Sequence, residues 1–207
     1  MSSLVFDTET TGLPKRSRFG YDYQNLDDFK QARIVSISWI VTYPQKKQRY
    51  YIIAPENFVI SPESIAIHGI TQDIALEQGV AFDDVMDEFM HDLAQVSVVV
   101  AHNLEFDINV LKSEFYRRHR MADIATLDGK QTFCTMMKAK EMFKLVKRPR
   151  LAELHHQFFG GSIANAHNAM YDTQYCYECY MKLCEYGLPL KTSKKRKISD
   201  VDSDDDE

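Results

Sequence analysis

The sequence predicts an α/β fold in which helices lie on both faces of a mixed central sheet. Three strand-like segments come first, and a short apolar strand-like segment then separates two amphipathic helical patterns. A further strand-like segment and a group of helices complete the chain. This order of elements is typical of a sheet whose faces are covered by helices.

The first three predicted strands are rich in β-branched and aromatic residues. They span Leu4 to Phe6, Ile34 to Tyr43 and Tyr50 to Ala54, and the polar stretch from Tyr43 to Lys47 predicts a turn between the last two. Together these segments predict an antiparallel meander. The segment from Pro14 to Arg33 is polar, aromatic and irregular, and it either shapes access to a site or forms a plain surface loop.

The middle of the chain carries two helical patterns around one buried strand. Ser97 to Ala101 (SVVVA) is a continuous apolar run of the kind found in strands covered on both faces. Asn103 is the expected N-cap of the helix that follows it. Apolar residues recur at helical spacing in the first pattern at Phe82, Val85, Met86, Phe89, Met90 and Leu93, and in the second at Leu104, Ile108, Leu111 and Phe115.

The last part of the domain combines one strand with three helices. A short strand is predicted at Thr132 to Thr135, with helices near Met136 to Phe143 and Arg150 to Phe159. Gly160 and Gly161 are expected to end the second of these helices. The final helix is predicted from Ala169 to Tyr186.

Length and composition predict one globular domain over residues 1–190 and a disordered charged tail over residues 191–207. The 207 residues suffice for a substantial core. Residues 1–190 hold 20 basic and 24 acidic side chains, which excludes a global basic field. An enzyme acting on nucleic acid would therefore depend on local basic patches and bound metal ions.

The cysteines and the hydropathy predict an intracellular, reducing setting with no membrane partner. No signal peptide is recognisable, and no apolar run approaches the roughly 20 residues that span a bilayer. Cys176 and Cys179 form a single CxxC within a helical pattern, where small core residues are favoured over a zinc site.

The tail contains a basic cluster, KKRK, from Lys194 to Lys197, followed by DVDSDDDE. Such a cluster predicts recognition by a nuclear import receptor, and hence the nucleus as a location, or a phosphate-binding arm. A solubilising tail without a receptor is the alternative. The acidic end competes for the lysines, which argues against simple binding of nucleic acid.

Asp7 and Glu9 are two residues apart in the predicted first strand, within VFDTETTG. Strand side chains alternate between faces, so both carboxylates leave the same face as Val5. Two anions on one face suit a hard divalent ion such as Mg²⁺ or Mn²⁺. The alternative is a turn after an edge strand.

Two predicted helices each offer a carboxylate on the inward face, at Asp107 and Asp172. An unpaired buried charge is costly, so each position implies a cation, either a metal ion or a basic side chain. An acidic residue near a helix N-terminus is a further explanation for Asp107. Four acids from three elements could hold two divalent ions. His167, just before the last helix, could accept a proton from water there, or could be an ordinary surface histidine.

Three segments resemble the motifs of the DEDDh, or DnaQ-like, 3′ to 5′ exonucleases. They are FDTET at 6–10, AHNLEFDINVL at 101–111 and HNAMYD at 167–172, in the family's order and spacing. PESIAIHGIT at 62–71 and TFCTMMKAKEMF at 132–143 are similar to the proofreading epsilon subunit of bacterial DNA polymerase III. The resemblance covers about residues 3–186.

The resemblance implies a ribonuclease H-like fold, a two-metal site holding Mg²⁺ or Mn²⁺, and His167 as the general base. It assigns the metal-binding role to Asp7, Glu9, Asp107 and Asp172. It also implies that further residues surround the terminal nucleotide, namely Thr10, Glu63, His68 and Phe106. A satisfied core histidine and a helix staple are the alternatives for His68 and Phe106.

The function implied by this resemblance is hydrolysis of single-stranded nucleic acid, with DNA favoured, from the 3′ end to nucleoside 5′-monophosphates. Repair, proofreading and end trimming are its settings, and polymerase or repair complexes are candidate partners. An RNA-trimming exoribonuclease of the same fold is one alternative. A non-catalytic nucleic-acid-binding or polymerase-associated module is the other, but no metal carboxylate or histidine of the motifs is missing.

Overall fold

The computed structural model describes residues 2–163 and 167–187, and its centre is a five-stranded mixed sheet. The strands are β1 Ser3–Thr10, β2 Ile34–Val41, β3 Lys47–Ile52, β4 Val98–Ala101 and β5 Gln131–Cys134, in the order β3-β2-β1-β4-β5. The first three pair antiparallel, while β4 pairs parallel to β1 and to β5. The predicted meander and mixed sheet are confirmed.

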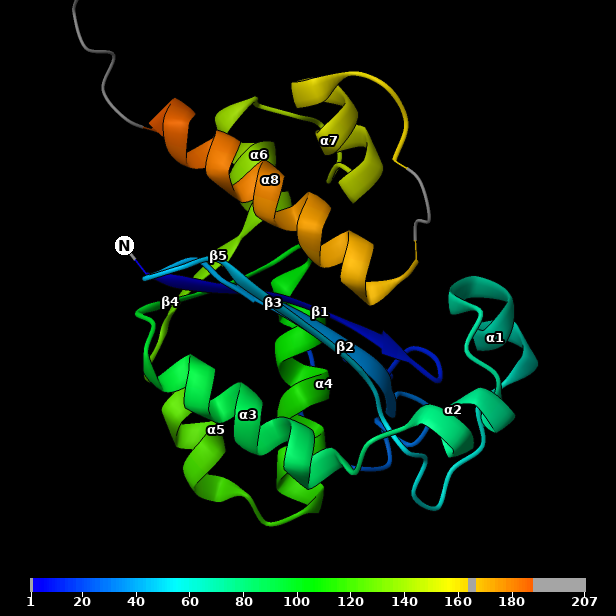
Figure 1. Cartoon of the computed structure of the whole chain (residues 1–207). Helices are drawn as coiled ribbons and strands as arrows, with labels where there is room; N and C mark the ends of the chain where they lie inside the picture. Colours follow the sequence, from blue (N-terminus) through cyan, green and yellow to red (C-terminus); the bar gives the residue numbers. More distant parts are fainter. Residues whose placement is uncertain (1, 164–166, 188–207) are drawn as a thin grey trace, which may run out of the picture.

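Helices cover both faces of this sheet (Figure 1). One face carries α3 Phe82–Ala94, α4 Leu104–Arg117 and α5 Met121–Asp128, and the other carries α6 Thr135–Met142, α7 Leu151–Phe159 and α8 Ala169–Gly187. Two short helices, α1 Pro62–His68 and α2 Gln72–Gln78, lie beyond the end of β1. The predicted α/β class, with helices on both faces, is therefore confirmed.

The main core lies between the sheet and the layer of α3, α4 and α5. Leu4 and Phe6 of β1 are fully buried there, and the Phe6 and Phe89 rings meet edge to face with centroids 5.8 Å apart. The indole of Trp39 donates a 2.9 Å hydrogen bond to the buried carboxylate of Asp92. This bond ties β2 to α3.

A second apolar layer forms under α8 on the opposite face. Val5 of β1 and Val100 of β4 pack there against Cys176 and Tyr180. Cys179, with Leu183, joins α8 to α6 and α7. The four cysteines are free, and the CxxC pair is part of the core rather than of a metal cluster.

Three helices were not predicted, namely α1, α2 and α5. Each has only seven or eight residues, which is too short for a repeating apolar stripe. Local signals do exist at two of them, because the side chains of Ser61 and Thr71 accept hydrogen bonds from the first turns of α1 and α2.

Three local predictions are corrected. β1 continues to Thr10, beyond the predicted end at Phe6, because its pairing with β2 extends that far. β2 ends at Val41 rather than Tyr43 and β3 begins at Lys47 rather than Tyr50, because these two residues pair, so the turn spans residues 42–46. Asn103 precedes α4 but adopts a left-handed backbone with φ of 68°, and its side chain makes no capping bond.

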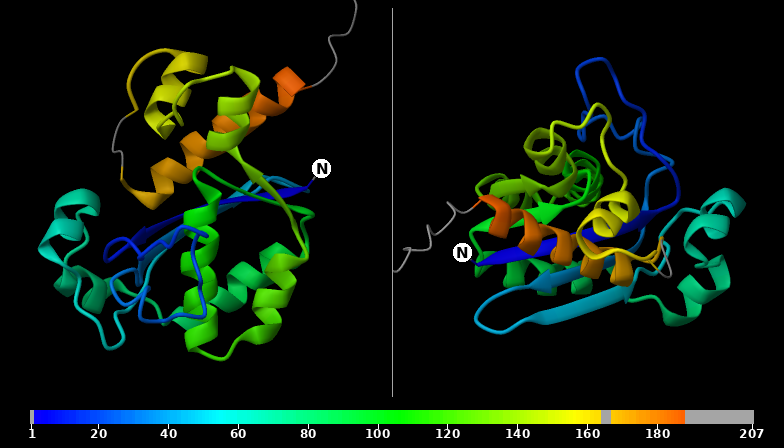
Figure 2. Two further views of the ribbon diagram at one scale, coloured as in Figure 1. Left: turned by 180° about the vertical axis from the view of Figure 1, so that it is seen from behind. Right: turned by 90° about the horizontal axis from the view of Figure 1, so that it is seen from above.

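The segment from Pro14 to Arg33 is irregular, as predicted, and it lies along α4 (Figure 2). Phe29 is fully buried in the main core. Arg16 forms an ion pair with Glu105 in the first turn of α4, and the Tyr23 ring contacts Tyr116 in its last turn. The segment is anchored at both ends of α4 and is more than a plain surface loop.

Some predictions fall outside the described residues. The domain boundary at residue 190, the charged tail and the basic cluster from Lys194 to Lys197 lie there. Within residues 2–163 and 167–187, no helix is both long and apolar enough to cross a membrane.

Candidate functional site

The site is built on the face of β1 that looks toward the start of α8. Side-chain alternation sends Leu4 and Phe6 into the main core and leaves Val5 facing α8. Asp7 and Glu9 continue the Val5 face. The register with β2 shifts between Glu9 and Thr10, so the regular ladder ends immediately after the second carboxylate.

Asp172 completes a cluster of three carboxylates. It lies in the first turn of α8, where its Oδ2 accepts a 2.9 Å hydrogen bond from the backbone N–H of His167. One ligand oxygen from each of Asp7, Glu9 and Asp172 lies within 4.8 Å of the other two. The strand and the helix thus bring Asp172 together with two acids from the start of the chain.

Asp107 lies beside this cluster but is not one of its three members. Its side chain is only 2% exposed, and its Oδ1 accepts hydrogen bonds from the backbone N–H and the hydroxyl of Thr8, at 3.2 and 2.8 Å. Its predicted inward orientation is confirmed. The cation that this position seemed to require is replaced in part by two hydrogen-bond donors.

Burial raises the pKa of all four carboxyls, and repulsion between them raises it further at Asp7 and Glu9. Burial, followed by repulsion from Asp107, Glu9 and Asp172, holds the pKa of Asp7 well above its usual range. The same causes raise the pKa of Glu9 to about 8, and burial raises that of Asp107 to about 7 against the hydrogen bonds from Thr8. Burial also raises the pKa of Asp172. Ionising these groups together at neutral pH requires compensating positive charge.

The donor set fits a hard divalent cation. Oδ1 of Asp172 is buried and has no hydrogen-bond partner among the described residues, although buried carboxylate oxygens are normally paired. All the ligand atoms on offer are carboxylate oxygens, which favour Mg²⁺ or Mn²⁺ over Zn²⁺. A cation here would pair the free oxygen and offset the repulsion.

His167 and Asp172 both line a cleft of about 640 Å³. It is exposed and adopts a left-handed backbone with φ of 67°, a conformation that is uncommon outside glycine. The backbone bond to Asp172 holds it in place. The predicted histidine is therefore next to the carboxylate cluster.

The residues predicted to surround a terminal nucleotide occupy different positions. The hydroxyl of Thr10 donates to the Gly12 carbonyl at 2.7 Å. Glu63 is exposed on α1 and lines a second cleft, of about 610 Å³, with Thr11 and Gly12. Phe106 is half-buried against the main core on α4.

His68 is buried at the end of α1 with only one ring nitrogen hydrogen-bonded. Its Nδ1 accepts a 3.1 Å bond from the Ile70 backbone, while Nε2 is buried and has no partner in the described part of the chain. Burial lowers the pKa of His68, and the neighbouring Thr10 backbone partly offsets this effect.

Sequence reasoning missed the other walls of the cleft that His167 lines. Those walls include His102, Asn103, Arg148 and Arg150. His102 is neutral, because burial lowers its pKa to about 4, and its Nε2 is 3.1 Å from the Pro149 carbonyl. The basic run KRPR at 147–150 was the available signal, but nothing in the sequence places it beside Asp172.

Comparisons with known proteins agree with this geometry. Residues 4–180 match the model of a family described as Exonuclease. The chain is 28% identical over 187 residues to the DNA polymerase III subunit epsilon of Salmonella typhimurium, covering 87% of this chain and 70% of the relative. A PolC-type DNA polymerase III from Caldanaerobacter subterraneus is 24% identical over 205 residues, which is 97% of this chain but 12% of that protein.

Solved structures share the fold. Exonuclease X in complex with 5′ overhanging duplex DNA superimposes with a TM-score of 0.60 at 20% identity, covering 89% of this chain and 92% of that chain. Exonuclease I of E. coli in complex with a dT13 oligonucleotide gives a TM-score of 0.65 at 19% identity, over 90% of this chain and 41% of that chain. At these identities the structures confirm the ribonuclease H-like fold.

Proposed function

This chain belongs to the exonuclease family, and on that premise we propose that it hydrolyses single-stranded DNA from the 3′ end and releases nucleoside 5′-monophosphates. Membership makes it a nuclease, that is, a phosphodiester hydrolase. The direction, the product and the preference for DNA are the proposed part. Relatives bound to DNA oligonucleotides support DNA as the polymer.

The single observation that carries the proposal is the carboxylate cluster with an unpaired buried oxygen. Asp7, Glu9 and Asp172 gather their oxygens within 4.8 Å, and Oδ1 of Asp172 has no partner among the described residues. Repulsion within the cluster destabilises the ionised chain, so the arrangement serves binding of a cation rather than stability.

We assign the divalent ions to four residues. Asp7, Glu9 and Asp172 hold one ion, and Asp7 with the adjacent Asp107 serves a second. When bound, two such ions stabilise the negative charge of the reacting phosphate and make a water molecule easier to deprotonate.

His167 acts on the proton of the attacking water. Its side chain is exposed and lines the cleft, and its backbone is fixed to Asp172, so the imidazole stays beside the cluster. Histidine changes its charge near neutral pH and therefore serves as a general base there. The proton passes from the water to the imidazole and then to solvent.

The terminal nucleotide is assigned to the side of the cluster nearest α1. Thr10 follows directly after Glu9, and Glu63 lines the cleft that starts at Thr11 and Gly12. The free Nε2–H of His68 is a donor for a sugar or phosphate oxygen, since Nδ1 already accepts a bond from the backbone. Phe106 is the weakest of the four assignments because its ring packs against the core.

A polymerase or repair complex is the proposed setting. The similarity to a subunit of DNA polymerase III supports it. Migration of the native protein at the mass of the free chain in size-exclusion chromatography of cell extract would contradict it.

The decisive experiment uses 5′-labelled single-stranded DNA and RNA of equal sequence with Mg²⁺, Mn²⁺ or chelator. We expect a ladder that shortens from the 3′ end, only with metal, and faster on DNA. Asp172→Asn and His167→Gln should each lower the rate by about 10²–10³-fold or more. Asp84→Asn, an exposed acid on α3, is the matched control and should keep the wild-type rate.

Two outcomes would contradict the proposal. Shortening from the 5′ end would refute the assigned direction. A metal-independent ladder, or one that survives Asp172→Asn, would refute the assigned centre. A faster reaction on RNA would transfer the same chemistry to an exoribonuclease.

A further inference from the structure

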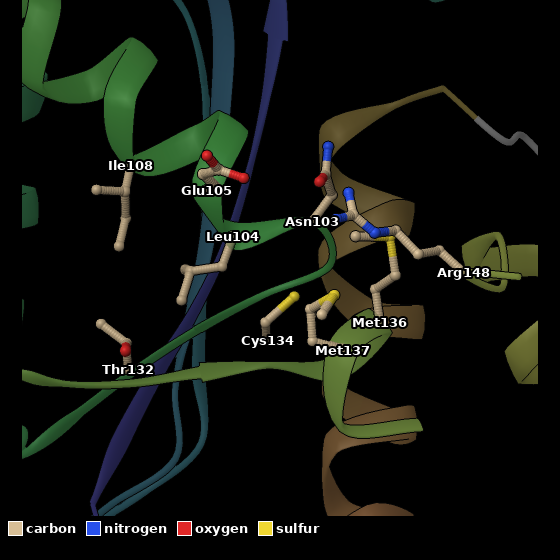
Figure 3. Close-up of a pocket in the computed structure, with 9 residues that line it drawn as sticks. All are labelled: Asn103, Leu104, Glu105, Ile108, Thr132, Cys134, Met136, Met137 and Arg148. Atoms are coloured by element: carbon tan, nitrogen blue, oxygen red, sulfur yellow. The ribbon is translucent and has the colours of Figure 1, made fainter. Parts of the chain in front are cut away.

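A smaller cavity lies next to the cleft that His167 and Asp172 line, on the side of α6. It encloses about 350 Å³ between the start of α4, strand β5 and the first turn of α6 (Figure 3). It shares Asn103, Met136 and Arg148 with the cleft that holds His167 and Asp172. The two hollows are therefore neighbours with a common wall.

The walls of this cavity are mainly apolar and flexible, and the acidic residue that lines it, Glu105, is ion-paired with Arg16. Leu104 and Ile108 of α4 face Met136 and Met137 of α6, with Cys134 between them (Figure 3). Thioether side chains adapt their shape and make favourable contacts with π systems. Such a surface accepts a flat heterocycle without reading its identity, which suits an enzyme that processes every base.

Arg148 supplies positive charge at the common wall. Its guanidinium points toward Asn103 over Met136 (Figure 3). Arg148 is exposed, but the backbone beside it is fixed because Pro149 is buried and its carbonyl contacts His102 at 3.1 Å. The planar fork of an arginine matches the geometry of a phosphate.

We propose that this cavity is a base subsite for a nucleotide upstream of the scissile bond, and that Arg148 contacts the phosphate which links that nucleotide to the catalytic cleft. The inference rests on the proposed function, because it takes the strand to run out of the carboxylate centre. The apolar walls of the cavity suit a base, and the guanidinium of Arg148 suits a phosphate of the nucleic-acid backbone.

Positive charge and a shared wall with the cleft both favour a nucleic acid as the ligand of this cavity. The segment from Lys144 to Arg150 carries four basic residues and no acidic ones, and it borders both hollows. A strand that passes from the 640 Å³ cleft into the smaller cavity crosses the wall that Arg148 shares with Asn103 and Met136. An apolar peptide would offer no negative charge to the guanidinium of Arg148.

The first test places a fluorescent reporter in the cavity. Met137→Trp introduces an indole where the native side chain is 44% exposed, and the chain's one natural tryptophan, Trp39, is fully buried. Binding of unlabelled dT oligonucleotides in Ca²⁺ should quench the added fluorescence by stacking. Met121→Trp, at a 48% exposed site on α5, is the matched control and should show no quenching.

The second test locates the base by affinity. One abasic nucleotide is moved stepwise from the 3′ end of a labelled DNA strand, and the Kd is measured by anisotropy. At one position upstream of the last nucleotide, the wild-type Kd should rise by about fivefold or more. This increase in Kd should be smaller in Met137→Ala. Arg148→Gln should weaken binding of every strand, whereas the control Lys182→Gln, which changes a lysine of α8 that pairs with Glu185, should not.

The outcomes separate the two proposals. Quenching and an abasic step in a protein that hydrolyses nothing would sustain the subsite and refute the proposed function. The subsite alone would be refuted if the protein hydrolysed DNA from the 3′ end, but the added tryptophan were not quenched and the Kd did not depend on the position of the abasic nucleotide. Failure of the intact chain to bind any oligonucleotide would refute both.

Discussion

The two faces of β1 carry opposite consequences for stability. On the face toward α3 and α4, Leu4 and Phe6 are fully buried among other apolar side chains. On the face toward α8, Val5 is apolar as well, but Asp7 and Glu9 follow it and repel each other. One strand thus provides core packing with one set of residues and a charged site with the other.

α8 shows the same division along its length. Its middle and last turns bury Cys176, Cys179 and Leu183 against the sheet and against α6 and α7. Its first turn offers Asp172 to the carboxylate cluster. The unfavourable charges are therefore concentrated at one end of the sheet, where the apolar contacts of both helical layers hold them together.

Phe6→Ala tests the apolar face and should have the largest effect. Removing a fully buried ring that contacts Phe89 should lower the free energy of unfolding by about 3–5 kcal/mol. Urea denaturation at pH 7 with chelator measures it. Phe19→Ala, at an 83% exposed ring, should change it by less than about 0.5 kcal/mol.

An equal effect of the two phenylalanine substitutions would contradict the division between the faces. It would mean that Phe6 contributes no more to the folded state than a solvent-exposed ring. The intact slope of the denaturation curve is the check that both variants unfold as the wild type does.

The carboxylates of the site should make the free energy of unfolding of the metal-free protein depend on pH. The pKa of Glu9 is raised to about 8 and that of Asp107 to about 7, whereas both lie near 4 in an unfolded chain. Between about pH 4 and 8 the folded state thus binds more protons than the unfolded state, and stability falls as pH rises. Because one unit of pKa shift corresponds to about 1.4 kcal/mol, the expected loss is several kcal/mol.

Glu9→Gln and divalent metal provide the comparison for this pH dependence. Glu9→Gln removes one titrating carboxyl and should flatten the slope. Mg²⁺ or Mn²⁺ should reverse it, because a cation binds the ionised form and so stabilises the chain at high pH. Metal-free stability that rises from pH 5 to pH 8 would contradict the assigned electrostatics.

The sequence was sufficient to predict the elements whose periodicity is long or continuous. The stripe from Phe82 to Leu93 lies within α3, and the apolar run at residues 97–101 contains the fully buried β4. The alternation of Val5, Asp7 and Glu9 against Leu4 and Phe6 was also correct, because strand geometry leaves one arrangement.

The sequence was insufficient where tertiary contacts decide the result. It showed that Asp107 points inward, but the two donors from Thr8 appear only when β1 and α4 pack together. Arg148 was part of a visible basic run, yet its place beside Met136 depends on contacts between His102 and Pro149. Helix α5 is too short for a repeating apolar pattern to be recognised in the sequence.

The smallest predicted effect concerns Thr8, which connects the two faces of β1. Its side chain lies on the face of Leu4 and Phe6, yet its hydroxyl donates 2.8 Å to the carboxylate of Asp107 and lowers that pKa. Thr8→Val keeps the shape and removes the donor, so at pH 8, where Asp107 is ionised, it should cost about 1 kcal/mol of stability.

Thr8→Ser keeps the hydroxyl and should cost less than half as much at pH 8. At pH 5 Asp107 is neutral in the folded chain, since its pKa is about 7, and the cost of Thr8→Val should shrink because the bond favours the ionised form. A cost that is equal at both pH values would assign the effect to packing. A cost confined to pH 8 would show that the Thr8 hydroxyl stabilises the ionised carboxylate of Asp107.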